Sequence, residues 1–209
     1  MIDKICEYLT NKIKCKMPEF TNERLEIINY GIHLIVGEIP KTFVFIIIAM
    51  LLGVLKEFFI TILVIFPYRM VSGGFHLKTH FGCIFATSLM YCGTAFLGKI
   101  LVIPEISKKV LIILVWLISI IFCKLYAPAD TENVPILRKK DRKIKKILSY
   151  IVVTIILVIG FFIQNNIISN IILLGISMQS FSITRIAYNI TNNKYGYEVY
   201  EQNKEILNS

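Results

Sequence analysis

The sequence predicts an all-α, polytopic integral membrane protein with about four to six transmembrane helices and an N-terminal amphipathic helix. Hydrophobic residues make up 56% of the 209 residues, and the mean hydropathy is +0.67. The apolar residues also form blocks long enough to cross a bilayer, as transmembrane helices require. We therefore expect a multi-pass protein of the cell membrane, with the lipid bilayer as a permanent partner.

Residues 1–40 predict amphipathic or interfacial helices. Ile2, Ile5 and Leu9 recur at helical spacing with lysines around them, as in a helix that lies on a membrane surface. The segment from about 21 to 37 is apolar but carries several charges, which favours an interfacial or partly buried helix over a span. The N-terminus lacks the apolar core and cleavage site of a signal peptide, so we expect it to be retained.

Residues 43–66 are apolar apart from Lys56 and Glu57 near the middle. They fit either one span of 24 residues with a buried charge pair or a tight hairpin that turns at these two residues. Pro67 lacks the N–H group that a helix interior needs, so we expect the helix to end there. A loop is then predicted over residues 67–80.

Four further spans are predicted, at residues 81–103, 110–126, 147–163 and 167–188. The last is more polar than the others, and polar side chains inside a span can line a path for a transported solute. A basic loop is predicted at residues 127–146, between the second and third of these spans. The chain shows no internal repeat, so we expect one domain over residues 1–209.

The formal charge of +9 is concentrated in the run from Arg138 to Lys146, which holds seven basic residues and one acid. Such a patch can bind nucleic acid. A short basic loop beside an apolar span is more simply a signal that the loop stays in the cytoplasm, so we expect no nucleic acid partner. Counting spans back from this loop places residues 67–80 at the cytoplasmic face. If the N-terminal lysines are cytoplasmic too, residues 43–66 must be a hairpin.

The segment from Pro67 to Cys83 carries an arginine, a glycine pair, two histidines and a cysteine: Arg69, Gly73, Gly74, His76, His80 and Cys83. A cysteine attacks as a thiolate, and a nearby imidazole can accept its proton, so the pair can cleave acyl bonds. On one helix the step from His76 to Cys83 would rise about 10.5 Å, too far for a direct hydrogen bond. Either His76 folds back from the loop, or His80, on the same helical face as Cys83, is the partner. Spacing alone favours His80.

A zinc site is an alternative, because His76, His80 and Cys83 have the spacing of metal ligands. Residues 77–79 lack the glutamate that a zinc protease carries between its two histidines, so we expect no metal and no other cofactor. The five cysteines are odd in number and irregularly spaced, which argues against a disulfide framework. Four of them lack a neighbouring histidine and are expected to be small apolar residues: Cys6, Cys15, Cys92 and Cys123.

Two motifs make the chain resemble the accessory gene regulator B (AgrB) family of membrane cysteine endopeptidases from Gram-positive bacteria. The first motif is an arginine, a glycine pair, a histidine and a cysteine: Arg69, Gly73, Gly74, His76 and Cys83. The second is the segment YAPADTEN at residues 126–133, followed by Pro135 and Ile136. Val134 stands where the family usually has lysine. The resemblance covers nearly the whole chain, including the basic stretch and the two spans that follow it.

The resemblance implies that His76 is the base and Cys83 the nucleophile, and hence that His76 does not lie on the helix of Cys83. Family members remove the acidic C-terminal tail of a small quorum-sensing precursor, AgrD, and hold the new C-terminus as a thioester. An internal cysteine or serine of the peptide then closes a thiolactone or lactone ring. The implied partner is an AgrD-like precursor, and a homodimer is compatible with the resemblance.

Other motif residues are candidates for accessory or substrate-binding roles: Arg69, Gly73, Gly74, His80, Asp130, Glu132 and Asn133. The last three are expected on the same side of the membrane as the active site, where they either orient His76 or hold a loop. A small transporter or a non-catalytic membrane adaptor would also be polytopic. The two motifs favour the peptidase over both alternatives.

Overall fold

The computed structural model describes residues 2–17, 19–77, 79–132 and 135–208. Every regular element in these ranges is a helix, and three helical segments among them are long and apolar enough to cross a membrane. The prediction of an all-α membrane protein is therefore confirmed. The chain divides into two compact units, Met1–Met50 and Leu51–Ser209.

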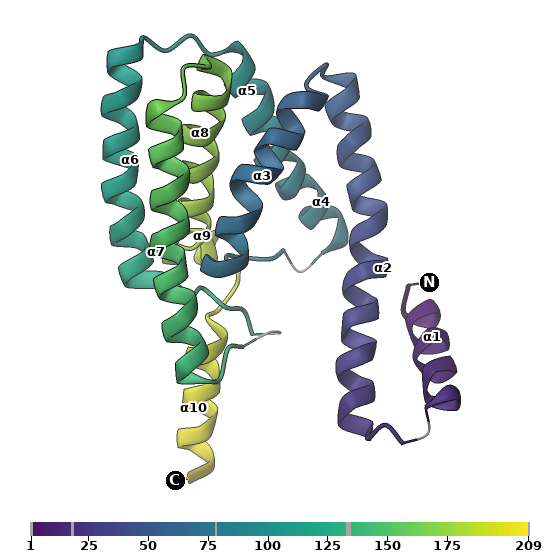
Figure 1. Cartoon of the computed structure of the whole chain (residues 1–209). Coiled ribbons are helices and arrows are strands. Elements are labelled where there is room, and N and C mark those ends of the chain that lie inside the picture. Colours follow the sequence, from purple (N-terminus) through teal and green to yellow (C-terminus); the bar gives the residue numbers. More distant parts are fainter. Residues whose placement is uncertain (1, 18, 78, 133–134, 209) are drawn as a thin grey trace. The chain divides into compact units, whose positions relative to one another are not determined.

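The first unit contains α1 (Ile2–Lys16) and nearly all of α2 (Asn22–Leu51), drawn in purple and dark blue in Figure 1. The hydroxyl of Thr10 donates a hydrogen bond to the side-chain oxygen of Asn29 at 2.9 Å and so joins the two helices. α2 is continuous over 30 residues, whereas the sequence predicted a boundary near residue 40. The composition changes there from charged to apolar, but both kinds of residue are compatible with a helix.

A turn at residues 52–54 separates α2 from α3 (Leu55–Ser72). Gly53 has a φ of +65°, a conformation that glycine adopts easily because it has no Cβ atom. Residues 43–66 thus contain two helices, and the chain turns at Gly53 rather than at Lys56 and Glu57. These two charged residues lie in the first turn of α3, where Glu57 is 4.0 Å from Lys99.

α3 continues through Pro67 to Ser72, contrary to the prediction that the helix ends at Pro67. Proline removes one backbone hydrogen bond from a helix interior. Packing offsets this loss, because Tyr68 and Ser72 are fully buried and α3 packs against α8 (Asn166–Ser182). The hydroxyl of Tyr68 also lies 3.2 Å from that of Ser180 on α8. The connection that was predicted over residues 67–80 therefore begins at Gly73.

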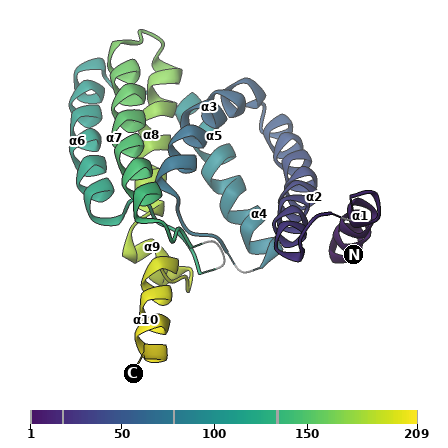
Figure 2. The same ribbon diagram turned by 60° about the horizontal axis from the view of Figure 1, so that its bottom comes forward.

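Helix α4 (His80–Ser88), the π-helical turn η1 (Leu89–Gly93) and α5 (Thr94–Ile100) follow one another without a break. This segment, α6 (Glu105–Tyr126) and α7 (Lys139–Phe162) provide the three candidate spans. α8 has 17 residues and is about 25 Å long, which is shorter than a typical span. Figures 1 and 2 show α6, α7 and α8 side by side, and α3 packs against α8 and α7.

α7 begins at Lys139, so most of the basic run forms its first turns, where the sequence predicted a loop up to residue 146. Lysine and arginine are good helix formers, and the run contains no glycine or proline to interrupt the helix. α9 (Arg185–Ile190) and α10 (Gly196–Asn208) follow α8. Figure 1 shows the start of α7 at the same end of the second unit as α9 and α10.

Candidate active site

The two sequence motifs meet through backbone hydrogen bonds. The N–H of Gly74 donates to the carbonyl of Ala129 at 3.0 Å, and the N–H of Ala129 donates to the carbonyl of Ser72 at 2.8 Å. Gly73 and Ala129 thereby form a short parallel bridge. Gly73 has a φ of +76°, and a Cβ atom at this position would overlap the carbonyl oxygen of Ala129. Both the backbone conformation and the close approach therefore require glycine at position 73.

Arg69 and Gln179 fix the segment that leads to His76. The guanidinium of Arg69 donates to the carbonyl of Phe75 at 2.8 Å and to the side-chain oxygen of Gln179 at 3.3 Å. The amide of Gln179 in turn donates to the carbonyl of Gly73 at 2.8 Å. Gln179 is fully buried and belongs to neither motif. The sequence could have pointed to Gln179, because a glutamine inside an apolar helix needs a hydrogen-bonding partner.

His76 and Cys83 line one cavity from different elements, as the resemblance implies. His76 lies in the non-helical segment 74–77 and is exposed. Thr79 caps α4 by accepting a hydrogen bond from the N–H of Gly82 at 3.1 Å. This cap places Cys83 in the first turn of α4, where the side chain is half-buried. The cavity has a volume of about 20 Å³, roughly enough for one water molecule.

Arg69 and Phe75 line this cavity too, so the hydrogen bond between them lies in its wall. His80 is the first residue of α4, and its side chain lies outside the described part of the chain. Among the side chains that the structure describes, no group of three or more histidine, cysteine, aspartate and glutamate residues could hold a metal ion. The arrangement thus brings together a thiol, an imidazole and a guanidinium.

Asp130 is tied to the loop that carries the second motif. Its side chain is 1% exposed and accepts a hydrogen bond from the guanidinium of Arg142 at 2.9 Å. The same carboxylate oxygen accepts a second bond from the N–H of Ile136 at 2.8 Å. These contacts favour the loop-holding alternative for Asp130 over direct contact with His76.

The hydroxyl of Tyr188 supports the same loop, because it donates to the carbonyls of Ala129 and Asp130 at 3.0 and 3.1 Å. Neither Tyr188 nor Arg142 could be recognised from the motifs, since both lie outside them. Glu132 is exposed in a turn. Asn133 lies outside the described residues.

The polar residues of α8 make hydrogen bonds to neighbouring helices and connections. The hydroxyl of Ser180 lies 2.8 Å from that of Ser119 on α6. Asn170 donates to the carbonyl of Leu101 at 2.8 Å. Paired polar groups of this kind hold helices together inside a membrane protein. The polarity that suggested a transport path therefore has an explanation in helix packing.

The profile of the AgrB family, accessory gene regulator B, matches residues 3–183. A protein of Clostridium perfringens (strain SM101 / Type A) that is named AgrB-like is 25% identical over 162 residues, which cover 76% of this chain and 75% of that protein. FsrB of Enterococcus faecalis (strain ATCC 47077 / OG1RF) is 30% identical, over 69% of this chain and 58% of its own length.

The accessory gene regulator protein B of Staphylococcus carnosus (strain TM300) is 31% identical, over 66% of this chain and 69% of its own length. No solved structure matches the chain. The family match includes both motifs and every residue that lines the cavity at Cys83. This chain therefore belongs to the accessory gene regulator B family, which is part of accessory gene regulator quorum-sensing systems.

Proposed function

We propose that this protein is a membrane-embedded cysteine endopeptidase that removes the C-terminal tail of an AgrD-like autoinducing-peptide precursor. The observation that carries the proposal is the shared cavity, which His76 and Cys83 line from two different elements. A base that lies outside the helix of its nucleophile can approach the thiol, whereas one seven residues away on the same helix cannot. Membership of the AgrB family supports the same assignment.

In this mechanism His76 accepts the proton of the Cys83 thiol, and the thiolate attacks the carbonyl carbon of the scissile peptide bond. The bond to the nitrogen of the tail breaks, and the imidazolium gives its proton to that nitrogen as the tail leaves. The N-terminal part of the precursor stays on Cys83 as a thioester. The thiol or hydroxyl of a cysteine or serine in the peptide then attacks the thioester carbon, and its proton passes through His76 to the departing sulfur of Cys83 as the ring closes. Exclusion of water keeps the thioester from being hydrolysed first.

The size of the cavity limits how the precursor binds. A volume of about 20 Å³ has room for one water molecule and not for an amino-acid side chain. We therefore expect the peptide to lie across the mouth of the cavity. Phe75 and Leu77 flank His76 in the sequence and line the same cavity, so we expect them to contact the precursor residues beside the scissile bond.

Contacts between the two motifs support a position at the cytoplasmic face. Arg142, which belongs to the basic run, binds Asp130, and the adjacent Ala129 pairs with Gly73. The basic run and the segment that carries His76 thus lie at one end of the second unit. Basic residues beside membrane spans stay in the cytoplasm, so we place precursor cleavage at that face.

The test compares two cysteine variants of the full chain, reconstituted in lipid vesicles with the cognate precursor. Cys83→Ala removes the nucleophile and should abolish release of the tail, measured by mass spectrometry. Cys92→Ala is the matched control, because Cys92 is buried on η1 and is not among the residues that line the cavity. This control should cleave at nearly the wild-type rate.

Cleavage by Cys83→Ala near the wild-type rate would refute the mechanism. Cys83→Ser should still capture the precursor in a pull-down while it releases little tail. That variant separates a loss of chemistry from a loss of binding, because the site keeps its shape.

A further inference from the structure

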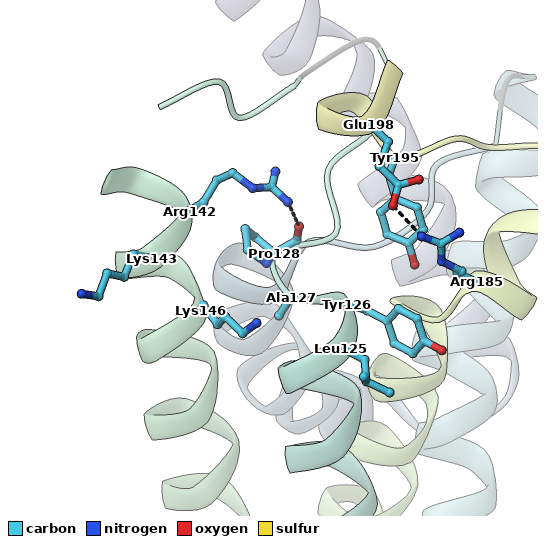
Figure 3. Close-up of a pocket in the computed structure, with 10 residues that line it drawn as sticks. All are labelled: Leu125, Tyr126, Ala127, Pro128, Arg142, Lys143, Lys146, Arg185, Tyr195 and Glu198. Atoms are coloured by element: carbon cyan, nitrogen blue, oxygen red, sulfur yellow. Dashed lines mark hydrogen bonds and ion pairs between the residues drawn. The ribbon is translucent and has the colours of Figure 1, made fainter. Parts of the chain in front are cut away.

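A second, larger cavity lies between the end of α6, the start of α7 and the segment from α9 to α10 (Figure 3). Its volume is about 340 Å³. Four cationic side chains and one carboxylate line it: Arg142, Lys143, Lys146, Arg185 and Glu198. Apolar and aromatic side chains, among them Leu125 and Tyr126, complete the lining. A concave surface with this excess of positive charge attracts an anion.

The cations of this basic cavity are neutralised to different degrees. Arg142 is paired with the buried carboxylate of Asp130, and Arg185 is paired with Glu198 at 2.6 Å. Lys146 donates to the carbonyl of Lys124 at 2.6 Å, which orients its amine without cancelling its charge. Lys143 lies one turn before Lys146 on α7, and in Figure 3 its amine points away from the other lining residues, so it lies at the rim of the cavity. Lys146 therefore contributes the unpaired positive charge inside the cavity, and Lys143 adds charge at its rim.

Tyr195 adds no negative charge to the lining. Burial raises the pKa of Tyr195, so its hydroxyl stays neutral at physiological pH and donates a hydrogen bond to the carbonyl of Ile183 at 2.7 Å.

The basic cavity lies at the ends of two candidate spans. Tyr126 is the last residue of α6, and α7 changes from basic to apolar after Lys146. Leu125 lines the cavity and is 62% exposed, so the apolar surface of α6 reaches the rim. A phospholipid matches both properties, because its phosphate needs cations and its acyl chains need apolar surface. An acidic peptide matches the cations only.

We propose that the basic cavity binds the phosphate of an anionic phospholipid, with Lys146 as the main ligand, Lys143 as a second charge at the rim and the acyl chains against α6. The site shares no lining residue with the cavity at Cys83. Arg142 lines the basic cavity and also binds Asp130. Lipid bound there would therefore stabilise the loop that pairs with Gly73.

The test follows the unfolding midpoint (Tm) of the full chain in a neutral detergent. Four ligands are titrated in separate samples: short-chain phosphatidylglycerol, phosphatidylcholine of the same chain length, inorganic phosphate and an oligoglutamate peptide. A ligand that binds the folded state raises Tm with its concentration. Phosphatidylglycerol should give a saturable rise, and the other three should act only at far higher concentration. Lys143→Gln/Lys146→Gln should weaken the apparent affinity for phosphatidylglycerol by about tenfold or more.

Lys139→Gln/Lys140→Gln is the matched control, because it removes the same charge from exposed residues of the same run that do not line the cavity. This control should keep the wild-type affinity. Lys143→Gln alone leaves the bond from Lys146 to Lys124 in place, so it should weaken binding without lowering Tm in the absence of lipid.

Three results would overturn the proposal. An equal loss of affinity in both double variants would mean that general surface charge attracts the lipid. A rise in Tm with inorganic phosphate that equals the rise with phosphatidylglycerol would mean that the cavity binds free phosphate and not a lipid headgroup. A response to oligoglutamate without one to phosphatidylglycerol would assign the basic cavity to an acidic peptide.

Discussion

The segment from Gly73 to His76 and the basic run from Arg138 to Lys146 lie at the same end of the second unit, but they are held in different ways. In the first segment, the carbonyls of Phe75 and Gly73 accept hydrogen bonds from Arg69 on α3 and Gln179 on α8. The backbone of this segment is also paired with that of the second motif. In the second, most of the charged side chains are exposed or half-exposed. Arg142 is half-exposed too, but it differs from its neighbours because it binds a buried carboxylate.

This difference separates substitutions that change geometry from substitutions that change only charge. A change within the first segment should displace His76 or its support. A change in the basic run should act through the electric field, unless it removes Arg142. Each prediction below therefore compares two similar residues that the structure places in different environments.

The largest effect is expected for His76. If this residue is the base, His76→Ala should lower the rate of precursor cleavage by about 10²–10⁴-fold, the usual contribution of a general base. His80→Ala should lower the cleavage rate much less. It is the matched control, because His80 lies between His76 and Cys83 in the sequence. Rates of tail release for both variants check the prediction. The reverse ranking would mean that helical spacing, which favours His80, identifies the true partner of Cys83.

The second effect concerns Arg142 and the stability of the loop around Asp130. Arg142→Gln leaves the carboxylate of Asp130, which is 1% exposed, without its cation. Removing one partner of a buried ion pair costs roughly 3 kcal/mol. Lys143→Gln removes the same charge at the next, exposed position, and should change stability by less than about 0.5 kcal/mol. Thermal unfolding in lipid-free detergent measures both. Equal stabilities would show that the ion pair does not hold the loop.

A third comparison uses two glycines with positive φ. Gly53 and Gly73 have φ of +65° and +76°. An added Cβ meets nothing within 4 Å at Gly53, whereas at Gly73 it overlaps the carbonyl of Ala129. Gly53→Ala should therefore cost only the backbone strain, about 1–2 kcal/mol.

Gly73→Ala carries a larger strain, because a φ of +76° with a ψ of −148° is essentially restricted to glycine, and it must also break the bridge to Ala129. It should lose more stability than Gly53→Ala and lose cleavage as well, because His76 follows three residues later. Unfolding midpoints and tail release, measured on both variants, check this. Normal cleavage by Gly73→Ala would show that the bridge to the second motif does not position His76.

The helical membrane fold could be predicted from the sequence because long apolar blocks are a local signal. The end of α3 could not. Pro67 normally stops a helix, and its tolerance here depends on Tyr68, which is buried against a distant helix. The start of α7 was missed for a related reason, since a run of lysines is compatible with a loop and with a helix that extends beyond the membrane.

The neighbourhood of the candidate site was only partly visible in the sequence. The motif residues Arg69, Gly73 and Gly74 could be singled out, and the structure ties all three to one backbone segment. Gln179 could not be assigned a role, because its partners lie far away in the sequence. Nor could Arg142 be distinguished from its basic neighbours, because only the fold places Asp130 beside it. The catalytic roles of His76 and Cys83 stay predictions.

The smallest effect is expected where charge alone acts. We hypothesise that the exposed lysines of the basic run draw the acidic tail of the precursor toward Cys83. The alternative is that these lysines only set the topology. Lys139→Gln/Lys140→Gln spares Arg142 and the lysines of the basic cavity, so it tests the hypothesis without disturbing the loop or the lipid site. Exposed charge pairs contribute roughly 0.2–1 kcal/mol each. The apparent KM should therefore rise a few-fold at low salt, while kcat stays unchanged.

Salt provides the internal control for this last prediction. The screening length falls from about 10 Å at 0.1 M to about 3 Å at 1 M ionic strength, so the wild-type KM should rise with salt until it meets that of the variant. Lys12→Gln/Lys14→Gln removes the same charge from exposed residues of α1 and should leave KM nearly unchanged. A variant that inserts correctly and keeps the wild-type KM at low salt would show that the run has no part in recognition. Lys139 and Lys140 would then differ from the Gly73–His76 segment in purpose, because these two lysines would serve topology alone.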